Sequence, residues 1–286
     1  MKILQILPAQ PTSDGDGVNI SRVADFQALA LDPYLMLDEI RSDDERDYLG
    51  GFPPHPHRGM ETFTYIRKGG FEHRDQLGNV RAIREGKVQW MSTGRGVVHS
   101  EMPLADAKEG LHGFQIWLNM PAKDKMRPPR YQDSAADEHQ QLETDGASLR
   151  LLAGDDWRFA GTEASAPLTG LAGDAAIADL TLAPDAQAEL DLSHLGRLAL
   201  YLHSGELQLQ DGKQLAAGNM LLLDSRYPLE LQAGFRGAGL LILAGNPIGE
   251  VVVQMGPFVM NTQAEILQAI RDYQNGDFGE IPSGSV

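Results

Sequence analysis

Two short motifs carry side chains that could bind a metal ion: His55-Pro-His57 and His99-Ser-Glu101. In a β-strand, residues i and i+2 point to the same face, so each motif would project both of its polar side chains together. Two such pairs on facing strands would offer three imidazoles and one carboxylate to a single cation. This donor set suits Fe, Mn, Co, Ni, Cu or Zn better than Mg or Ca, and it leaves an open position for water or a substrate.

The remaining candidates in this half of the chain are weaker. Glu61 has the same parity as His57 on an unbroken strand, but four residues at about 3.3 Å each place it about 13 Å away. His73 and His139 lie in charged, turn-like segments, and we expect them at the surface. His112 precedes an apolar run, which favours a structural, hydrogen-bonding role over a place beside a metal ligand.

The sequence around these motifs is typical of antiparallel β-structure. Between residues 18 and 120, short runs of Val, Ile, Leu, Phe, Tyr and Thr are broken every six to twelve residues by Gly, Asp, Asn or Pro. Examples are Glu61–Ile66, Val88–Met91 and Gly113–Leu118. This spacing predicts a β-sandwich or barrel.

A second series of strand-like runs begins near Ala147. It includes Leu149–Leu152, Leu198–Leu202, Met220–Leu223 and Gly239–Leu243. The two halves therefore look like weak repeats of one β-rich architecture.

The tail of the chain follows a different pattern. Asn261-Thr-Gln-Ala-Glu265 resembles a capped helix start, and apolar residues follow it at helical spacing. These residues are Ile266, Leu267, Ile270 and Tyr273. We expect one short amphipathic C-terminal helix.

The chain is long enough for two domains of ordinary size. It has 286 residues, of which 42% are hydrophobic and 22% charged, as in a soluble globular protein. The polar, proline-bearing stretch Lys123–Arg130 suits an interdomain connection. We therefore predict an N-terminal metal-binding β-domain over residues 1–130 and a C-terminal β-domain over residues 131–286 that also carries the helix.

The composition excludes several classes of protein. The absence of cysteine rules out disulfides, thiolate metal sites and cysteine nucleophiles, and it fits the reducing cytoplasm, where we expect this protein. No apolar run approaches the roughly 18 residues that a membrane-spanning helix needs, so no membrane partner is expected.

The charge distribution bears on nucleic acid as a partner. Residues 1–140 carry 17 basic and 21 acidic side chains (net −4), and residues 141–286 carry 7 and 19 (net −12), which together give −16. Phosphate backbones would be repelled by the second half. Direct binding to nucleic acid is therefore disfavoured.

Four longer stretches contain or accompany the two metal-binding motifs. They are Gly50–Gly59, Gln89–Pro103, His112–Trp117 and Gly256–Thr262. Together they span both halves of the chain and resemble the pirins, a family of the cupin superfamily. Because pirins are bicupins, the resemblance implies an all-β fold of two cupin-type barrels packed face to face, with a short C-terminal helix.

The resemblance also implies a ligand set. The general cupin pattern, His-x-His-x3-Glu with a later His, is matched literally by His55, His57, Glu61 and His99. Pirins instead use the carboxylate two residues after the last His, which carries over to Glu101. The second half has neither His-x-His nor His-x-Glu, so we expect its barrel to be free of metal.

Two functions of different classes are implied by the resemblance. Some pirins resemble quercetin 2,3-dioxygenases, which cleave a flavonol with dioxygen at one divalent metal; Fe(II) is our first expectation here, with Mn, Co, Ni, Cu or Zn as alternatives. Glu101 would then be both ligand and general base, and Phe52, Met91 and Trp117 would line an apolar chamber for the small aromatic substrate.

The alternative is a metal-binding regulatory protein that acts through a protein partner, either a transcription factor or a metabolic enzyme. An open, apolar chamber around the metal would favour the enzyme, whereas a sealed site would favour the regulator.

Overall fold

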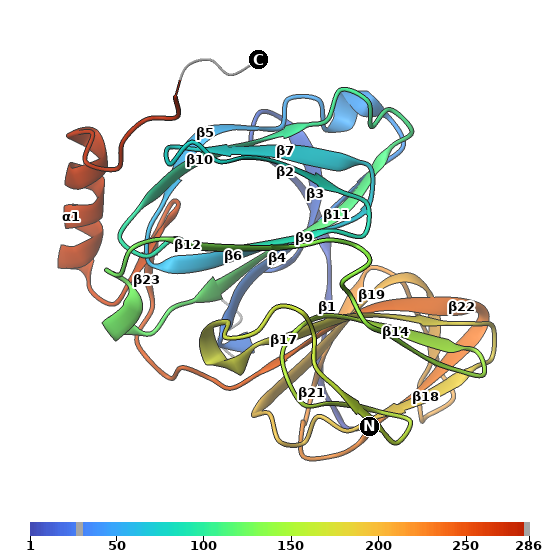
Figure 1. The fold of residues 1–286 in the computed structure, drawn as a ribbon. Helices are drawn as coiled ribbons and strands as arrows, with labels where there is room; N and C mark the ends of the chain where they lie inside the picture. Colours follow the sequence, from blue (N-terminus) through green and yellow to red (C-terminus); the bar gives the residue numbers. More distant parts are fainter. Residues whose placement is uncertain (27–30, 283–286) are drawn as a thin grey trace. The chain divides into compact units, whose positions relative to one another are not determined.

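The computed structural model describes residues 1–26 and 31–282, in which the chain folds into two compact all-β units (Figure 1). The first, here called the N-terminal barrel, contains residues 11–26, 34–136 and 248–282. The second, the C-terminal barrel, contains residues 1–10, 31–33 and 137–247. An all-β fold of two barrels with one short helix is the architecture that the sequence predicts.

The N-terminal barrel consists of two sheets (Figure 1). They enclose an apolar core. Within the described residues the larger sheet has seven strands in the order β12-β9-β6-β11-β4-β3-β2, and the smaller has four in the order β5-β10-β7-β8. The strands are β2 (Gln10–Asp14), β3 (Val18–Ala24), β4 (Tyr34–Ser42), β5 (Phe52–His57), β6 (Met60–Lys68), β7 (Gly70–Asp75), β8 (Val80–Arg84), β9 (Val88–Ser92), β10 (Val97–Pro103), β11 (Leu111–Asn119) and β12 (Arg130–Ser134).

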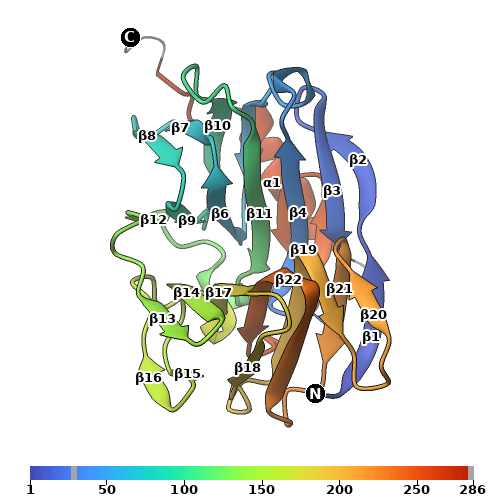
Figure 2. The same ribbon diagram turned by 90° about the vertical axis from the view of Figure 1, so that its right-hand side faces the viewer.

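The C-terminal barrel is built around one large sheet (Figure 2). The described part of this sheet has 11 strands, and the core of the barrel is rich in leucine. Its strands are β1 (Ile3–Pro8), β13 (Gln141–Thr144), β14 (Ala147–Ala153), β15 (Trp157–Phe159), β16 (Thr162–Ala164), β17 (Ala176–Leu182), β18 (Gln187–Leu190), β19 (Arg197–Gln208), β20 (Gln214–Ala216), β21 (Asn219–Leu223) and β22 (Leu229–Gly245). Short 3-10 helices over Glu45–Asp47, Ala122–Asp124 and Ala172–Asp174 lie in the connections of the two barrels.

The strand-like runs of the sequence lie in strands of both barrels. Those of the first half fall in β6, β9 and β11, and those of the second half in β14, β19, β21 and β22. His139, which we expected at the surface, is buried, and its Nδ1 lies 3.0 Å from the carbonyl oxygen of Leu151. The expectation was wrong because it rested on the polar residues around His139. The hydrogen-bond contact with a backbone carbonyl allows the imidazole to be buried among them.

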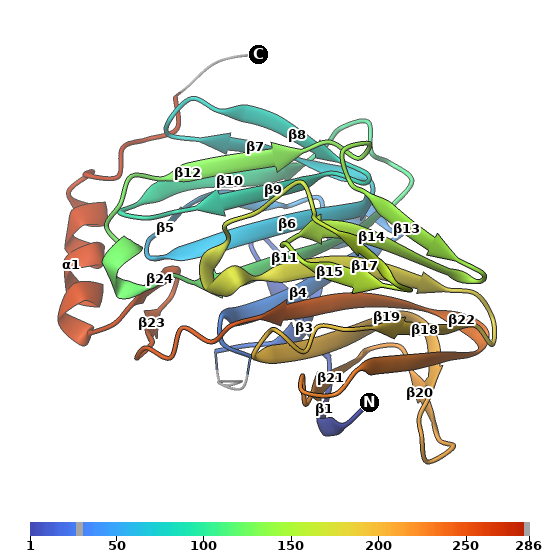
Figure 3. The same ribbon diagram turned by 60° about the horizontal axis from the view of Figure 1, so that its bottom comes forward.

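The tail forms β23 (Val253–Met255), β24 (Phe258–Met260) and α1 (Gln263–Gln274), and it belongs to the N-terminal barrel (Figure 3). Thr262 caps the helix: its hydroxyl accepts from the backbone N–H of Glu265, as the sequence predicts. Ile266 and Ala269 pack with Val98, Phe258 and Phe278 in one apolar cluster.

A partly buried ion pair holds this tail on the barrel. Arg58 Nη1 donates to Asp272 Oδ2 at 2.7 Å, and the Arg58 guanidinium lies 4.5 Å from the centroid of the Phe278 ring. At Gly59 the backbone has φ = +77°, and a side chain there would collide with the carbonyl oxygen of Val259 in β24. The backbone of β24 therefore lies directly against the backbone at Gly59, just after β5, with no room for a side chain between them.

These contacts explain where the units differ from the two contiguous domains predicted from the sequence. Residues 248–282 pack with the N-terminal barrel, and β1 pairs with β21 in the C-terminal barrel. The expected connection at Lys123–Arg130 lies inside the N-terminal barrel, and the division falls between Ala136 and Asp137.

Lys125 shows why this stretch is not a linker. Its side chain is 1% exposed, and Nζ donates to Gly59 O at 2.7 Å, Asn119 Oδ1 at 2.8 Å and Val259 O at 2.9 Å. Burial lowers the pKa of Lys125 to about 8, which still leaves the ammonium mostly charged at pH 7. Each of the three ammonium protons of Lys125 thus has an oxygen acceptor, and one of these oxygens belongs to the tail strand β24.

None of the helices in the described part of the chain has the length and apolar character needed to cross a bilayer.

Replacement of Lys125 by methionine should destabilise the protein strongly. Lys125→Met leaves three buried oxygens without their donor, which we expect to cost about 2–5 kcal/mol of unfolding free energy. Urea denaturation measures the loss. Lys123→Met, which removes an exposed amine two residues away, is the matched control and should be nearly neutral. Equal stability of the two variants would contradict the structural role of Lys125.

Candidate metal centre

The antiparallel pairing of β5 with β10 brings the two histidine motifs together. In this register His99 lies opposite His55, and Val97 lies opposite His57. Directly opposed residues of an antiparallel pair have Cβ atoms about 4.5–5.5 Å apart. The parity of each motif then places the three imidazoles on one face of the small sheet, as the sequence predicts.

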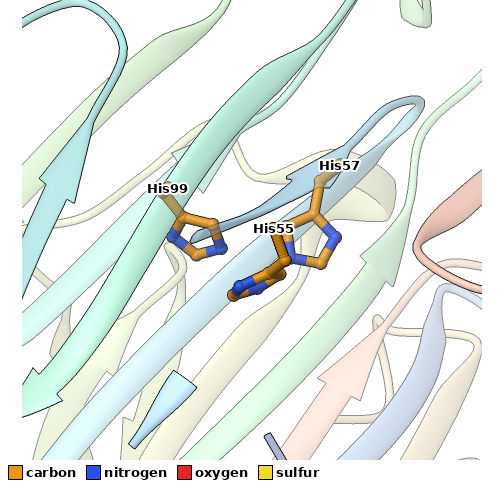
Figure 4. Close-up of side chains that lie close together, drawn as sticks. All are labelled: His55, His57 and His99. Atoms are coloured by element: carbon orange, nitrogen blue, oxygen red, sulfur yellow. The ribbon is translucent and has the colours of Figure 1, made fainter. Parts of the chain in front are cut away.

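The three imidazoles form a compact cluster (Figure 4). The ring centroids are 4.4 Å apart for His55 and His99, 4.8 Å for His55 and His57, and 4.9 Å for His57 and His99. One nitrogen from each ring lies within 4.8 Å of the other two. A single transition-metal ion, with metal–nitrogen bonds of about 2.0–2.1 Å, fits donors at this spacing.

Each imidazole uses Nδ1 for a hydrogen-bond contact within the barrel. His55 Nδ1 lies 2.8 Å from Pro53 O, His57 Nδ1 lies 3.3 Å from Pro257 O, and His99 Nδ1 lies 3.3 Å from the Nδ1 atom of His73. A carbonyl oxygen can only accept, so Nδ1 of His55 and His57 carries the proton. Nε2 is then the nitrogen that can face a cation.

Burial keeps two members of this cluster, His57 and His99, neutral. Desolvation, followed by the neighbouring His55, holds the pKa of His57 well below its ordinary value. Desolvation likewise lowers the pKa of His99, with His55, His57 and His73 adding to the effect. Neutral imidazoles have the free lone pair that a metal requires.

Within residues 1–26 and 31–282, the buried Nε2 of His99 has no hydrogen-bond partner. Buried polar atoms are nearly always satisfied, so an unpartnered nitrogen within a cluster of imidazoles fits an atom that binds a cation. The donor set therefore fits a divalent first-row metal held by His55, His57 and His99.

Glu101 is close to this cluster without belonging to it. It follows His99 on the same face of β10 and lines the same pocket as His55 and His57. Among the described residues, the group of donor atoms within 4.8 Å of one another contains the three histidines and not Glu101. The Glu101 carboxylate instead lies 3.1 Å from the Thr64 hydroxyl, which is also 2.6 Å from Gln115 Oε1.

Glu61, the carboxylate of the general cupin pattern, is engaged elsewhere. It is fully buried; Oε2 accepts from Trp90 Nε1 at 3.0 Å, and Oε1 accepts from Arg127 Nη2 at 3.3 Å. Both oxygens thus stabilise contacts among β6, β9 and the segment before β12.

A pocket of about 610 Å³ opens beside the cluster, within the size range of small-molecule sites. Phe52 and Trp117 line it, as we expected. Met91 does not; it is buried in β9, where it pairs with Thr62 and Tyr131. The Trp117 ring also meets the His57 ring edge to face at 5.1 Å between centroids.

The surface position predicted for His73 is wrong. We expected it at the surface, but it is fully buried in β7, where its Nδ1 contacts His99 and its Nε2 lies 3.5 Å from Asp75 Oδ2. A signal was present, because His73-Arg-Asp75 has the same i, i+2 spacing as the two ligand motifs. His112 has the structural role that we favoured: it is buried, with Nε2 2.8 Å from Glu39 Oε1.

Comparison with protein families matches the chain in two regions. Residues 17–118 match the Pirin family model, and residues 177–279 match the model of the Pirin C-terminal cupin domain. Most of the first match lies in the N-terminal barrel, and most of the second lies in the C-terminal barrel. The second match also includes the tail, which packs with the N-terminal barrel.

Individual relatives resemble the chain over nearly its whole length. A candidate quercetin 2,3-dioxygenase of Vibrio cholerae is 47% identical, with 97% of each chain covered, and a pirin-like protein of Caulobacter vibrioides is 38% identical, with 96% of this chain and 98% of the relative covered. The crystal structure of quercetin 2,3-dioxygenase from Acinetobacter baumannii superposes with a TM-score of 0.87 at 29% identity, covering 98% of this chain and 99% of that one. By its sequence and its two cupin barrels, this chain belongs to the pirin family.

Proposed function

We propose that this protein is a metal-dependent dioxygenase that opens a flavonol such as quercetin with dioxygen and releases carbon monoxide. The observation that carries the proposal is the pocket beside three clustered imidazoles. The similarity to the Vibrio cholerae relative and to the Acinetobacter baumannii quercetin 2,3-dioxygenase supports the same reaction class.

His55, His57 and His99 would hold one divalent metal through Nε2. Three imidazole nitrogen donors suit Fe(II), our first expectation, and also Mn, Co, Ni, Cu and Zn. When bound, the metal would supply a Lewis acid for the flavonol hydroxyl and a site for the reaction with dioxygen.

The walls of the pocket suit a flat aromatic molecule that carries hydroxyl groups. Phe26, Phe52 and Trp117 provide aromatic surface, and Ile20, Met36 and Ile40 add apolar surface. A polar part of the lining contains Arg22, Asp38 and Gln115. Arg22 donates to both oxygens of Asp38, at 2.9 and 2.8 Å, so this pair is held in a fixed orientation in which it could bind ring hydroxyls.

Glu101 is the residue we propose to accept the proton of the flavonol hydroxyl. It is a buried carboxylate that lines the pocket and lies on the same strand face as His99. A base must come within about 2.6–3.2 Å of the proton donor, and a substrate bound between Glu101 and the histidines would satisfy that requirement. We propose that Glu101 also approaches the metal as a fourth ligand, as the pirin pattern implies.

The pocket favours the enzyme over a regulatory protein. A site that served only to sense a metal would need no chamber of about 610 Å³ beside the ligands. A regulatory role through a protein partner is therefore not part of the proposal.

Removal of two ligands should abolish metal binding. The double variant His55→Ala/His57→Ala should fall from about one transition-metal ion per chain to nearly none, because the His99 imidazole and the Glu101 carboxylate alone hold such a metal only weakly. Elemental analysis of purified protein measures the content. The matched control, His139→Ala/His194→Ala, also removes two imidazoles and should keep the full content. A double ligand variant that retains its metal would refute the ligand assignment.

Exchange of the proposed base should separate metal binding from turnover. Glu101→Gln keeps the size of the side chain but loses the charge, so flavonol cleavage should fall about 10²–10⁴-fold while much of the metal remains. Oxygen uptake with quercetin, per bound metal, gives the rate. Glu61→Gln is the control and should cost far less activity once corrected for folded protein. An equal loss in both variants, or none in Glu101→Gln, would remove Glu101 from the chemistry.

A further inference from the structure

A continuous chain of buried side chains extends from His99 into the small sheet of the N-terminal barrel. His99 Nδ1 lies 3.3 Å from His73 Nδ1, and His73 Nε2 lies 3.5 Å from Asp75 Oδ2. The three residues are at most 1% exposed. The pairing of β10 with β7, in which His99 lies opposite Asp75 and Glu101 opposite His73, fixes their order.

Asp75 is the fixed end of this chain. Its Oδ1 accepts the backbone N–H groups of Leu77 at 2.9 Å and Asn79 at 3.0 Å, and its Oδ2 accepts from Asn79 Nδ2 at 2.7 Å. These donors all belong to the turn that joins β7 to β8. The carboxylate therefore cannot rotate away, and Oδ2 stays 3.5 Å from His73 Nε2, an ion-pair distance at which His73 Nε2 makes no hydrogen bond to the described residues.

The acceptor at Asp75 determines where the protons of both imidazoles lie. A carboxylate favours the proton on the nearer nitrogen, which is His73 Nε2, and a neutral imidazole then has its lone pair on Nδ1. Two ring nitrogens in contact can share only one proton, so His99 Nδ1 must carry it. His99 Nε2 is left with a free lone pair, and among the described residues it has no hydrogen-bond partner.

We propose that His73 and Asp75 are positioning residues for the metal, because together they fix the tautomer and ring orientation of His99. The proposal rests on the metal site of the proposed function, but on neither its substrate nor its reaction. The Nδ1 atoms of His55 and His57 rest on backbone carbonyls, which substitution cannot remove. His99 is therefore the ligand whose orientation depends on a replaceable side chain.

The test compares two replacements of His73 by metal affinity. His73→Leu fills the space but accepts no hydrogen bond, so the affinity should fall about 10–100-fold, as is typical when the hydrogen-bond partner of a ligand is lost. His73→Asn places an amide oxygen near the position of Nδ1, where it can accept from His99, and should restore most of the affinity. Co(II) and Zn(II), titrated against a competing chelator, are the probes, and the visible spectrum of bound Co(II) reports the geometry of the site.

A structural role alone would give a different pattern. The Tm of each metal-free variant measures how far folding is affected, and His139→Leu, which removes a buried imidazole in the C-terminal barrel, controls for that loss. We expect His139→Leu to bind Co(II) as the wild type does. Wild-type affinity and spectrum in His73→Leu, or equal weakening in the Leu and Asn variants, would overturn the proposal.

The outcomes also distinguish this proposal from the proposed function. If the wild type binds Co(II) but cleaves no flavonol with any metal, the function fails, while the comparison of His73 variants still decides the positioning role. If the wild type binds no metal ion, both are refuted.

Discussion

The register between β5 and β10 is the constraint on which the candidate site depends. Side chains alternate between the two faces of a strand, so a slip by one residue would turn His99 away from His55 and His57. Three prolines lie in β5, which is possible because this strand is the edge of its sheet. Between His99 and Glu101 the register shifts, with Glu101 opposite Phe52, so β5 contains the extra residue and β10 keeps its alternation.

A second set of contacts orients the three clustered imidazoles so that their Nε2 atoms can bind a metal. Each histidine has its Nδ1 engaged, and the partners come from different parts of the N-terminal barrel: Pro53 in β5, Pro257 in the tail and His73 in β7. The tail is in turn fixed by Arg58, the residue after His57, which forms an ion pair with Asp272 of the tail. Lys125 joins the carbonyl oxygens of Gly59 and Val259. The packing of the tail on β5 therefore helps to orient a ligand that lies 200 residues away in the sequence.

Local pattern was sufficient to predict the strands and the shared face of the residues within each histidine motif, because parity within a strand depends on neighbouring residues alone. Local pattern did not predict burial at positions where partners distant in the sequence determine it. His73 lies between Glu72 and Arg74, which are half-exposed, so its charged surroundings concealed the alternation that buries His73 and Asp75. Lys125 appeared to lie in a linker because its three oxygen partners come from elsewhere in the chain. The membership of residues 248–282 in the N-terminal barrel likewise depends on contacts that no local signal reveals.

The central claim is that the Nε2 atoms of His55, His57 and His99 hold one metal ion per chain. Anomalous diffraction at the absorption edge of the bound metal tests it most directly, in crystals of protein loaded with Fe(II) or Co(II) under anaerobic conditions. We predict a single strong peak in each chain, about 2.0–2.2 Å from all three Nε2 atoms. A peak at another group of residues, or bonds formed through Nδ1, would contradict the account.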